Sequence, residues 1–198
     1  MTEAHRPLLV VLTGPSGAGK DSLLARLKPQ DPSSYVVVNV TTRPPRTGEQ
    51  EGVDYSFVSK AEFERLRRDG ELLEHALVYG QDKGVPKSPI RQALASGRDV
   101  LLRTDIQGAR TIKHLVPGAT TIFVSPPSET ELRRRVRQRG GDTQEQVRIR
   151  EETAAQEMAT ATEFDYHIIN DDLEECVNEI RRIITKEHSR PDRDKIIV

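Results

Sequence analysis

The chain has 198 residues and a formal net charge of −1, so nothing in its overall charge attracts it to nucleic acid or to an anionic membrane. Only 4% of the residues are aromatic and none is Trp, which argues against a base-stacking surface for single-stranded nucleic acid. The only cysteine is Cys176, so no internal disulfide is possible, and no apolar run is long enough for a signal peptide or a membrane span. We therefore expect one cytoplasmic domain that carries small inserted lobes.

A glycine-rich segment follows the first apolar stretch. Residues 8–12 are all aliphatic and predict a buried strand, and leucines recur at helical spacing over residues 23–27. The segment between them comprises Gly14, Pro15, Ser16, Gly17, Ala18, Gly19, Lys20, Asp21 and Ser22. It fits the phosphate-binding pattern G-x-x-x-x-G-K-[ST] up to its last position, so backbone N–H groups and the lysine are expected to bind phosphate. The alternative is an ordinary glycine-rich turn.

Asp21 departs from that pattern, which has a Ser or Thr there to hold magnesium; Ser22 follows one position late. A carboxylate is favoured at a helix N-terminus by the helix dipole, so Asp21 could serve the helix alone. Alternatively, its oxygen atoms bind the magnesium in place of the hydroxyl, since Mg²⁺ prefers hard oxygen ligands.

The rest of the chain alternates apolar strands with helical patterns. Core strands are predicted at residues 8–12, 35–40, 100–104, 120–124 and 166–169, and half-buried ones at 55–58 and 72–79. Helices are predicted at residues 59–68, 87–96, 107–115, 128–140, 143–162 and 173–187. Ser59 is the expected cap of the first of these, with Glu62 as its capping-box partner, and Asp142 or Thr143 that of the fifth. Residues 188–195 are polar and expected to fray.

This order predicts an α/β fold with a five-stranded parallel sheet and helices on both faces, as in P-loop NTPases. Residues 39–96 interrupt the rhythm and are interpreted as an inserted lobe, which leaves residues 1–38 and 97–198 as the core. Ligands of such sheets lie beyond the carboxyl ends of the strands, where both the phosphate-binding loop and Asp105 are expected.

A basic loop between the second and third predicted strands carries Arg43 and Arg46, three residues apart in a proline-stiffened stretch. Guanidinium groups match phosphate geometry, and a stiff loop loses less entropy on binding. The alternative is a solvated basic loop.

Together these segments resemble guanylate kinases over residues 8–184. The phosphate-binding loop is followed by T-R-x-x-R-x-G-E-x-x-G-x-D-Y at residues 42–55, L-x-E at 72–74, D-x-Q-G at 105–108, R-G at 139–140 and N-D-D at 170–172. The arginine-containing stretch is the most specific of these. The resemblance implies a P-loop nucleoside monophosphate kinase that transfers the γ-phosphoryl group of ATP to GMP or dGMP with Mg²⁺. It leaves the oligomeric state open.

The resemblance also implies roles in the acceptor site. Arg43, Arg46, Glu49 and Tyr55 match residues that hold the GMP phosphate. Glu74 and Asp105 match carboxylates that accept hydrogen bonds from guanine N–H groups, which suits acceptor-only side chains. The alternatives are a surface carboxylate for Glu74 and a helix cap for Asp105.

For the donor site and the lid, the resemblance implies that Lys20, Arg139 and Arg150 act on the transferring phosphoryl group, with a lid over about residues 139–150. Arg135 matches an arginine near the donor nucleotide, and Asn170 a residue near adenine. A strand-end turn is the alternative for Asn170.

Several positions depart from the family pattern. Asn39 stands where a serine usually meets the guanine oxygen, and its amide N–H could replace that hydroxyl. Lys83 and Val85 replace a tyrosine and a serine or threonine at the GMP phosphate. Arg103 replaces an aspartate that approaches magnesium, while Asp21 brings a carboxylate to the same sheet edge. We interpret Asp21 and Arg103 as a paired exchange in which Asp21 binds magnesium, directly or through water, and Arg103 orients Asp21 or steadies a phosphate.

Two other functions remain open on the sequence. Ribose 1,5-bisphosphate phosphokinases resemble this family and also have G-K-D-S in the loop, but they lack the arginine–glutamate–tyrosine stretch found here. Non-catalytic guanylate-kinase-like modules typically lose the loop lysine, which this chain retains as Lys20.

Overall fold

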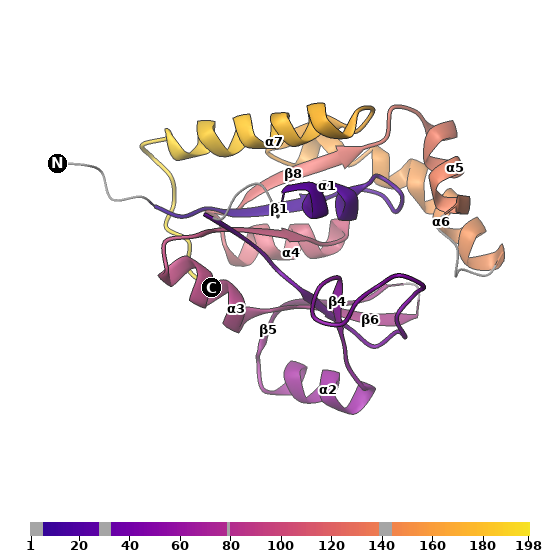
Figure 1. Ribbon diagram of the computed structural model, residues 1–198, viewed down its shortest axis with the longest axis horizontal. Helices are drawn as coiled ribbons and strands as arrows, with labels where there is room; N and C mark the ends of the chain where they lie inside the picture. Colours follow the sequence, from indigo (N-terminus) through magenta and orange to yellow (C-terminus); the bar gives the residue numbers. More distant parts are fainter. Residues whose placement is uncertain (1–5, 28–32, 79, 139–143) are drawn as a thin grey trace.

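The computed structural model describes residues 6–27, 33–78, 80–138 and 144–198. Within them, the core is a five-stranded parallel sheet in the order β2-β7-β1-β8-β9 (Figure 1). Its strands are β1 (Leu9–Thr13), β2 (Ser34–Val36), β7 (Asp99–Arg103), β8 (Thr120–Ser125) and β9 (Tyr166–Ile169). This confirms the predicted α/β class and its parallel sheet.

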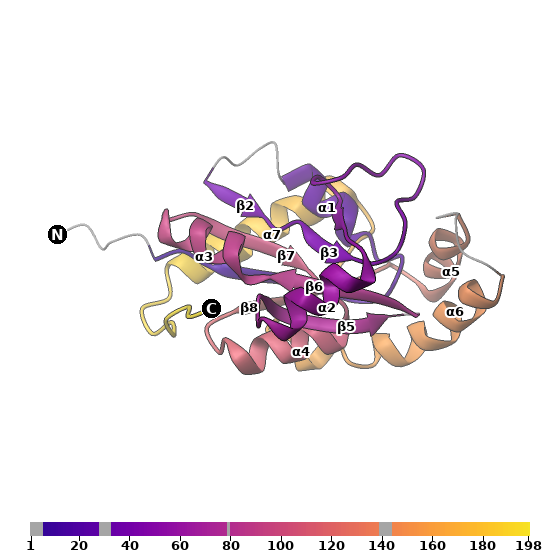
Figure 2. The same cartoon turned by 90° about the horizontal axis from the view of Figure 1, so that it is seen from below.

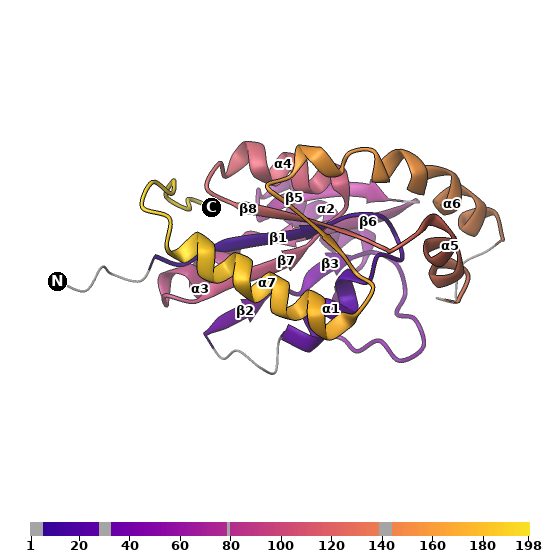
Figure 3. The same cartoon turned by 90° about the horizontal axis from the view of Figure 1, so that it is seen from above.

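Helices cover both faces of this sheet because the central strand is apolar on both sides. Leu8, Val10 and Leu12 pack in one cluster with α1 (Lys20–Leu27) and α7 (Leu173–His188). The helix α7 lies above the sheet in Figure 1 and in front of it in Figure 3. Leu9 and Val11 face the opposite way and pack in a second cluster with α3 (Lys87–Ala95) and α4 (Ile106–Leu115). The alternation follows from the two-residue period of a strand.

A second, four-stranded sheet lies beside the core, in the order β4-β3-β6-β5 within the described residues (Figure 2). Its strands are β3 (Asn39–Thr41), β4 (Tyr55–Phe57), β5 (Leu72–Val78) and β6 (Gln81–Pro86). The helix α2 (Lys60–Arg68) covers it through Phe63, which packs against Val40 and Leu72. The Ser59 hydroxyl accepts a hydrogen bond from the backbone N–H of Glu62, as the predicted cap requires.

The prediction of one strand over residues 35–40 is wrong. The chain runs beside β7 as far as Val37, whose N–H donates to the Leu101 carbonyl at 2.9 Å, and then enters the second sheet, where Asn39 pairs with Tyr55. A continuous apolar run is compatible with a strand of either sheet, so the hydrophobic pattern does not show where the chain passes from one sheet to the other.

The strand β6 was not predicted, because Gln81, Asp82, Lys83 and Gly84 are poor strand formers by composition. The strand forms nevertheless, because β5 and β3 lie on either side of it and supply partners for its backbone hydrogen bonds.

The helices α5 (Glu129–Gln138) and α6 (Gln144–Met158) pack on each other at one end of the molecule, through Leu132, Val136 and Ala154. A short 3₁₀ turn (Ala161–Glu163) links them to β9. The proposed caps Asp142 and Thr143 lie outside the described residues. No helix in the described part of the chain combines the length and apolarity needed to cross a membrane.

Residues 188–195, which were expected to fray, make some contacts with the rest of the fold, such as the hydrogen bond of 2.7 Å from Arg193 Nη2 to the Arg6 carbonyl. The imidazole of His188 contacts the buried Asp99 carboxylate at 2.7 Å, and the Val198 carbonyl accepts a hydrogen bond from Arg91 Nε at 2.6 Å. Ile196 and Val198 pack against the cluster under α3 and α4. The C-terminal segment is therefore part of the fold.

Candidate active site

A cleft of about 940 Å³ separates the phosphate-binding loop from the second sheet. Most of the residues predicted for the site line it, although they come from distant parts of the sequence. They are Gly14, Ser16, Gly17, Gly19, Lys20, Asp21, Ser22, Asn39, Arg43, Arg46, Tyr55, Glu74, Lys83, Asp105, Arg135 and Asn170. Arg139 lies outside the described residues, and so does the side chain of Arg150. Pro15, Ala18 and Glu49 do not line the cleft.

The loop between β1 and α1 has the shape expected of a phosphate cradle. Gly19 has φ +95°, and a Cβ built on it would lie 2.2 Å from Asn170 Nδ2, so no other residue fits. Lys20 Nζ donates to the carbonyl oxygens of Gly14 and Pro15 at 2.5 and 3.0 Å. The lysine thus lies against the loop from which it would reach a phosphate.

Asn170 fastens this loop. Its buried amide donates to the Ala18 carbonyl at 2.8 Å, and its own backbone carbonyl accepts from both terminal nitrogens of Arg135 at 3.1 Å. Arg135 is held in turn by Glu131, 2.7 Å from its Nε. Asn170 therefore positions the loop and Arg135, a role that the sequence did not predict for it.

The arginine-containing loop is organised by Glu49. Both of its carboxylate oxygens accept from Arg43 at 2.6 Å, and the Arg46 N–H donates to it at 2.8 Å. Burial tends to raise the pKa of Glu49, but these donors outweigh it and the pKa is lowered. The Arg43 guanidinium also lies 4.9 Å from the centre of the Tyr55 ring. Glu49 thus fixes the side chain of Arg43 and the backbone at Arg46.

Glu74 and Asp105 form the acidic part of the cleft. Glu74 is 6% exposed, and burial followed by the nearby Asp105 charge raises its pKa to about 7, against the opposing effects of Thr104 and Lys83. Asp105 Oδ1 accepts from the Gly108 N–H at 2.8 Å and caps α4. Asp105 is therefore a helix cap and a cleft residue at once, so the two interpretations do not exclude each other.

Asn39 is oriented by the protein itself. Its Nδ2 donates to the Arg103 carbonyl at 2.7 Å, so at least one of its amide hydrogens is not available to a ligand. Val85 is 1% exposed and belongs to the apolar cluster under α3. These departures from the family pattern thus contribute to the wall of the cleft.

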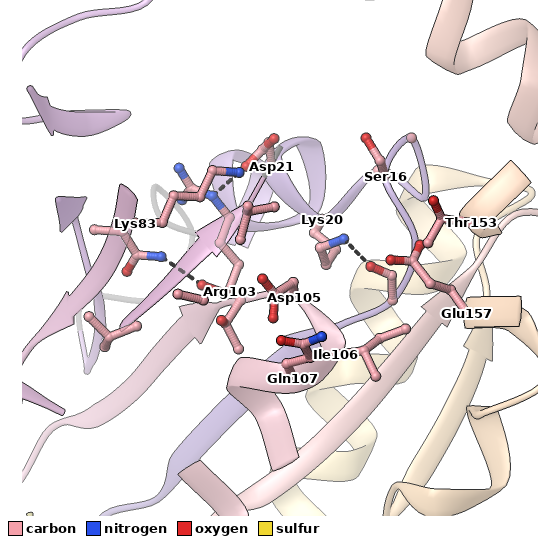
Figure 4. Close-up of a pocket in the computed structure, with 18 of the residues that line it drawn as sticks. Ser16, Lys20, Asp21, Lys83, Arg103, Asp105, Ile106, Gln107, Thr153 and Glu157 are labelled. Atoms are coloured by element: carbon pink, nitrogen blue, oxygen red, sulfur yellow. Dashed lines mark hydrogen bonds and ion pairs between the residues drawn. The ribbon is translucent and has the colours of Figure 1, made fainter. Parts of the chain in front are cut away.

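Asp21 and Arg103 form an ion pair between Oδ1 and Nε, as Figure 4 shows. Arg103 also donates through Nη2 to the Asp54 carbonyl at 2.6 Å, and its guanidinium lies 4.7 Å from the centre of the Tyr55 ring. Burial tends to lower the pKa of Arg103, but Asp21 and Tyr55 outweigh it and raise it. The predicted proximity of Asp21 and Arg103 is confirmed.

Sequence reasoning missed one wall of the cleft. Thr153, Gln156, Glu157 and Thr160 of the α6 segment line it. Figure 4 shows Thr153 and Glu157 on the side of Lys20 opposite Asp21 and Lys83. Their spacing places them on one helical face, a signal that was present but resembles any solvated polar face. Gln107 and Arg110 of α4 line the cleft as well.

Comparison with known proteins agrees with this geometry. The family model described as "Guanylate kinase" matches residues 6–187. The guanylate kinase of Carboxydothermus hydrogenoformans is 41% identical, over 96% of this chain and 93% of its own, and that of Synechococcus sp. (strain JA-3-3Ab) is 46% identical, over 91% and 83%. The crystal structure of guanylate kinase from Anaplasma phagocytophilum superposes with a TM-score of 0.78 at 35% identity, covering 96% of this chain and 90% of that one. With a family model matched over nearly its whole length and relatives above 40% identity, the chain belongs to the guanylate kinase family.

Proposed function

We propose that this protein is an ATP:GMP phosphotransferase that passes the γ-phosphoryl group of ATP to GMP or dGMP, giving ADP and GDP. One observation carries the proposal: a phosphate-binding loop with its lysine and a pair of guanine-compatible carboxylates line the same cleft. The family of the chain supports the same reaction.

Base recognition falls to Glu74 and Asp105. The Watson–Crick edge of guanine presents N–H donors, and ionised carboxylates only accept hydrogen bonds, so the pair suits guanine and disfavours adenine. Asp105 uses Oδ1 to cap α4, which leaves Oδ2 for the base. Glu74 accepts hydrogen bonds from the base in its ionised form, so it loses its proton when GMP binds.

Recognition of the acceptor phosphate falls to Arg43, Arg46 and Tyr55, with Glu49 as the support of Arg43. Lys83 lines the same cleft and adds a further positive charge. Preordered guanidinium groups bind phosphate with less loss of entropy than mobile ones.

Phosphoryl transfer needs positioning and charge neutralisation more than covalent chemistry. Lys20 leaves the loop carbonyls to reach the outer phosphates of the donor, and Arg135 and Asn170 hold the loop for it. Arg139 and Arg150 are proposed to act on the transferring group. Residues 39–96 are proposed to form the acceptor lobe, residues 139–150 the lid, and the rest of the chain the core.

A magnesium ion fits the residues present. Mg²⁺ is usually held by one or two carboxylates together with phosphate oxygens and water, so a cluster of acidic side chains is not required. Asp21 and Ser22 supply a carboxylate and a hydroxyl at the N-terminus of α1, and both line the cleft. When bound with ATP, the ion would neutralise the charge of the β- and γ-phosphates.

The test is an ADP-release assay with ATP and magnesium across GMP, dGMP, AMP, UMP and ribose 1,5-bisphosphate. GMP or dGMP is expected to be the best acceptor. Equal or faster turnover of the ribose bisphosphate would contradict the proposal in favour of a sugar phosphate kinase. Absence of turnover with every acceptor would point to a non-catalytic binding domain.

A further inference from the structure

Arg103 joins the two sides of the cleft. It is the last residue of β7, its side chain is 9% exposed, and its guanidinium contacts Asp21 on one side and the backbone of Asp54 and the ring of Tyr55 on the other. Asp21 lies at the start of α1, directly after the phosphate-binding loop, whereas Asp54 and Tyr55 end the arginine-containing loop. One buried cation therefore touches both proposed nucleotide sites.

The contacts continue beyond Arg103. The Tyr55 ring is shared with Arg43, whose guanidinium lies 4.9 Å from the ring centre and which Glu49 holds with two hydrogen bonds of 2.6 Å. A continuous series of contacts therefore runs from Asp21 through Arg103 and Tyr55 to Arg43. Packed contacts of this kind carry energetic coupling between two sites when the contacts have two alternative arrangements.

We propose that Arg103 is a positioning residue that couples the donor and acceptor sites, with Asp21 as its donor-side partner. In the free protein, the Asp21 carboxylate neutralises the guanidinium of Arg103. The magnesium that accompanies the donor phosphates would draw that carboxylate away from Arg103, so more of the Arg103 charge becomes available to an acceptor phosphate beside Tyr55. A bound donor nucleotide thus tightens the binding of GMP, and GMP tightens the binding of the donor by the same factor. This inference rests on the proposed function.

The experiment is calorimetric titration of GMP into the full chain, with and without a non-hydrolysable ATP analogue and with magnesium present throughout. For the wild type, we expect the analogue to tighten GMP binding by roughly tenfold, within the usual range of such couplings. Arg103→Met is expected to weaken GMP binding and to bring the coupling factor close to 1.

Asp21→Asn distinguishes coupling from simple structural damage. It removes the carboxylate that neutralises Arg103, so GMP should bind more tightly than to the wild type without any analogue, and the analogue should add little. A purely structural role of the pair would weaken GMP binding in both variants. Arg103→Lys retains the charge but not the planar guanidinium, so it should keep only part of the coupling. This variant tests the role of Arg103 if Arg103→Met does not fold.

Arg98→Met is the matched control. Arg98 precedes the opposite end of β7, and it too donates to a backbone carbonyl, that of Ser34 at 2.5 Å, and lies over a tyrosine ring, 5.5 Å from the centre of Tyr35. Its removal should leave the coupling factor unchanged. A wild-type factor of 1, unchanged coupling in Arg103→Met, or weaker GMP binding in Asp21→Asn would each overturn the inference. The ADP-release assay on the wild type separates the two proposals, because turnover of GMP without coupling refutes only the coupling.

Discussion

At the scale of single residues, Glu74 is a group whose charge near neutral pH depends on the fold. Its pKa rises from 4.5 to about 7 through burial and the neighbouring Asp105. The folded protein therefore binds this proton more tightly than the unfolded chain does. The resulting stabilisation is complete below the unfolded pKa and is lost as the pH rises through the folded one.

We predict two opposite pH trends from this shift. Between about pH 5 and 8, the Tm of the unliganded protein should fall relative to that of Glu74→Gln. GMP affinity should rise over the same range, by about tenfold per pH unit below pH 7, because the base binds the ionised form of Glu74. Thermal scans and calorimetry across this range are the measurements. The GMP phosphate also titrates near pH 6, so Glu74→Gln isolates the contribution of the protein. Parallel profiles for wild type and variant would show that Glu74 does not bind the base.

Lys20 supports a second prediction at this scale. Lys20→Ala should abolish measurable turnover, because the positive charge beside the outer phosphates is lost. Its hydrogen bonds to the carbonyls of Gly14 and Pro15 are each worth only about 1 kcal/mol, so the Tm should fall by no more than about 4–8 °C. Stability and turnover are measured on the same preparation. A collapse of the Tm would mean that the lysine mainly holds the loop together.

At the scale of elements, the first turn of α4 is built against the acidic pair. Asp105 caps the helix, and a Cβ on Gly108 would lie 2.1 Å from Thr104 Oγ1 and 2.9 Å from Glu74 Oε2. A glycine fits here because Thr104 and Glu74 pack closely against the helix at this position, and not because the backbone adopts an unusual conformation.

We predict that Gly108→Ala destabilises the protein, although alanine is favoured over glycine inside a helix by about 1 kcal/mol. The added methyl must displace Thr104 or Glu74, so GMP affinity should fall by tenfold or more while affinity for an ATP analogue stays unchanged. Thr111→Ala is the control, on the exposed side of the same helix, and should leave both affinities intact. A rise in Tm with unchanged GMP binding would show that the turn has room for the methyl group.

At the scale of the whole molecule, the C-terminal segment closes the apolar cluster beneath α3 and α4. Ile196 packs against this cluster, whereas the adjacent Ile197 is 69% exposed. Ile196→Ala should therefore lower the free energy of unfolding by about 1–2 kcal/mol, less than at a fully buried site, and Ile197→Ala by almost nothing. Denaturant titrations of the two variants make the comparison. Equal effects would mean that the segment does not pack as the structure has it.

Closure of the cleft is the other prediction for the whole molecule. The acceptor lobe and the lid should approach each other when both nucleotides are bound, because closure excludes water from the phosphates. Small-angle scattering should show a smaller radius of gyration with an ATP–GMP bisubstrate analogue than without it. GMP alone serves as the comparison, and identical curves in all three conditions would argue against closure.

The sequence by itself determined the features that depend on neighbouring residues. Local composition, turn chemistry and hydrophobic period predict the strand, glycine loop and helix around Lys20 and the Ser59 cap. The alternation of apolar strands with helices predicts that the core strands run parallel. The candidate site was predicted from motifs of the same local kind, and most of its described residues line one cleft.

Only the tertiary structure decided which groups meet. The division of residues 35–40 between two sheets, the strand β6 and the packed C-terminal segment depend on backbone partners elsewhere in the chain. Likewise, Glu49 supports Arg43, Asn170 fastens the phosphate-binding loop, and Arg103 joins Asp21 to Tyr55. The Asn170 and Arg103 contacts join segments distant in sequence, whereas Glu49 and Arg43 belong to one loop. The strength of every one of these contacts depends on burial, which a local pattern does not contain.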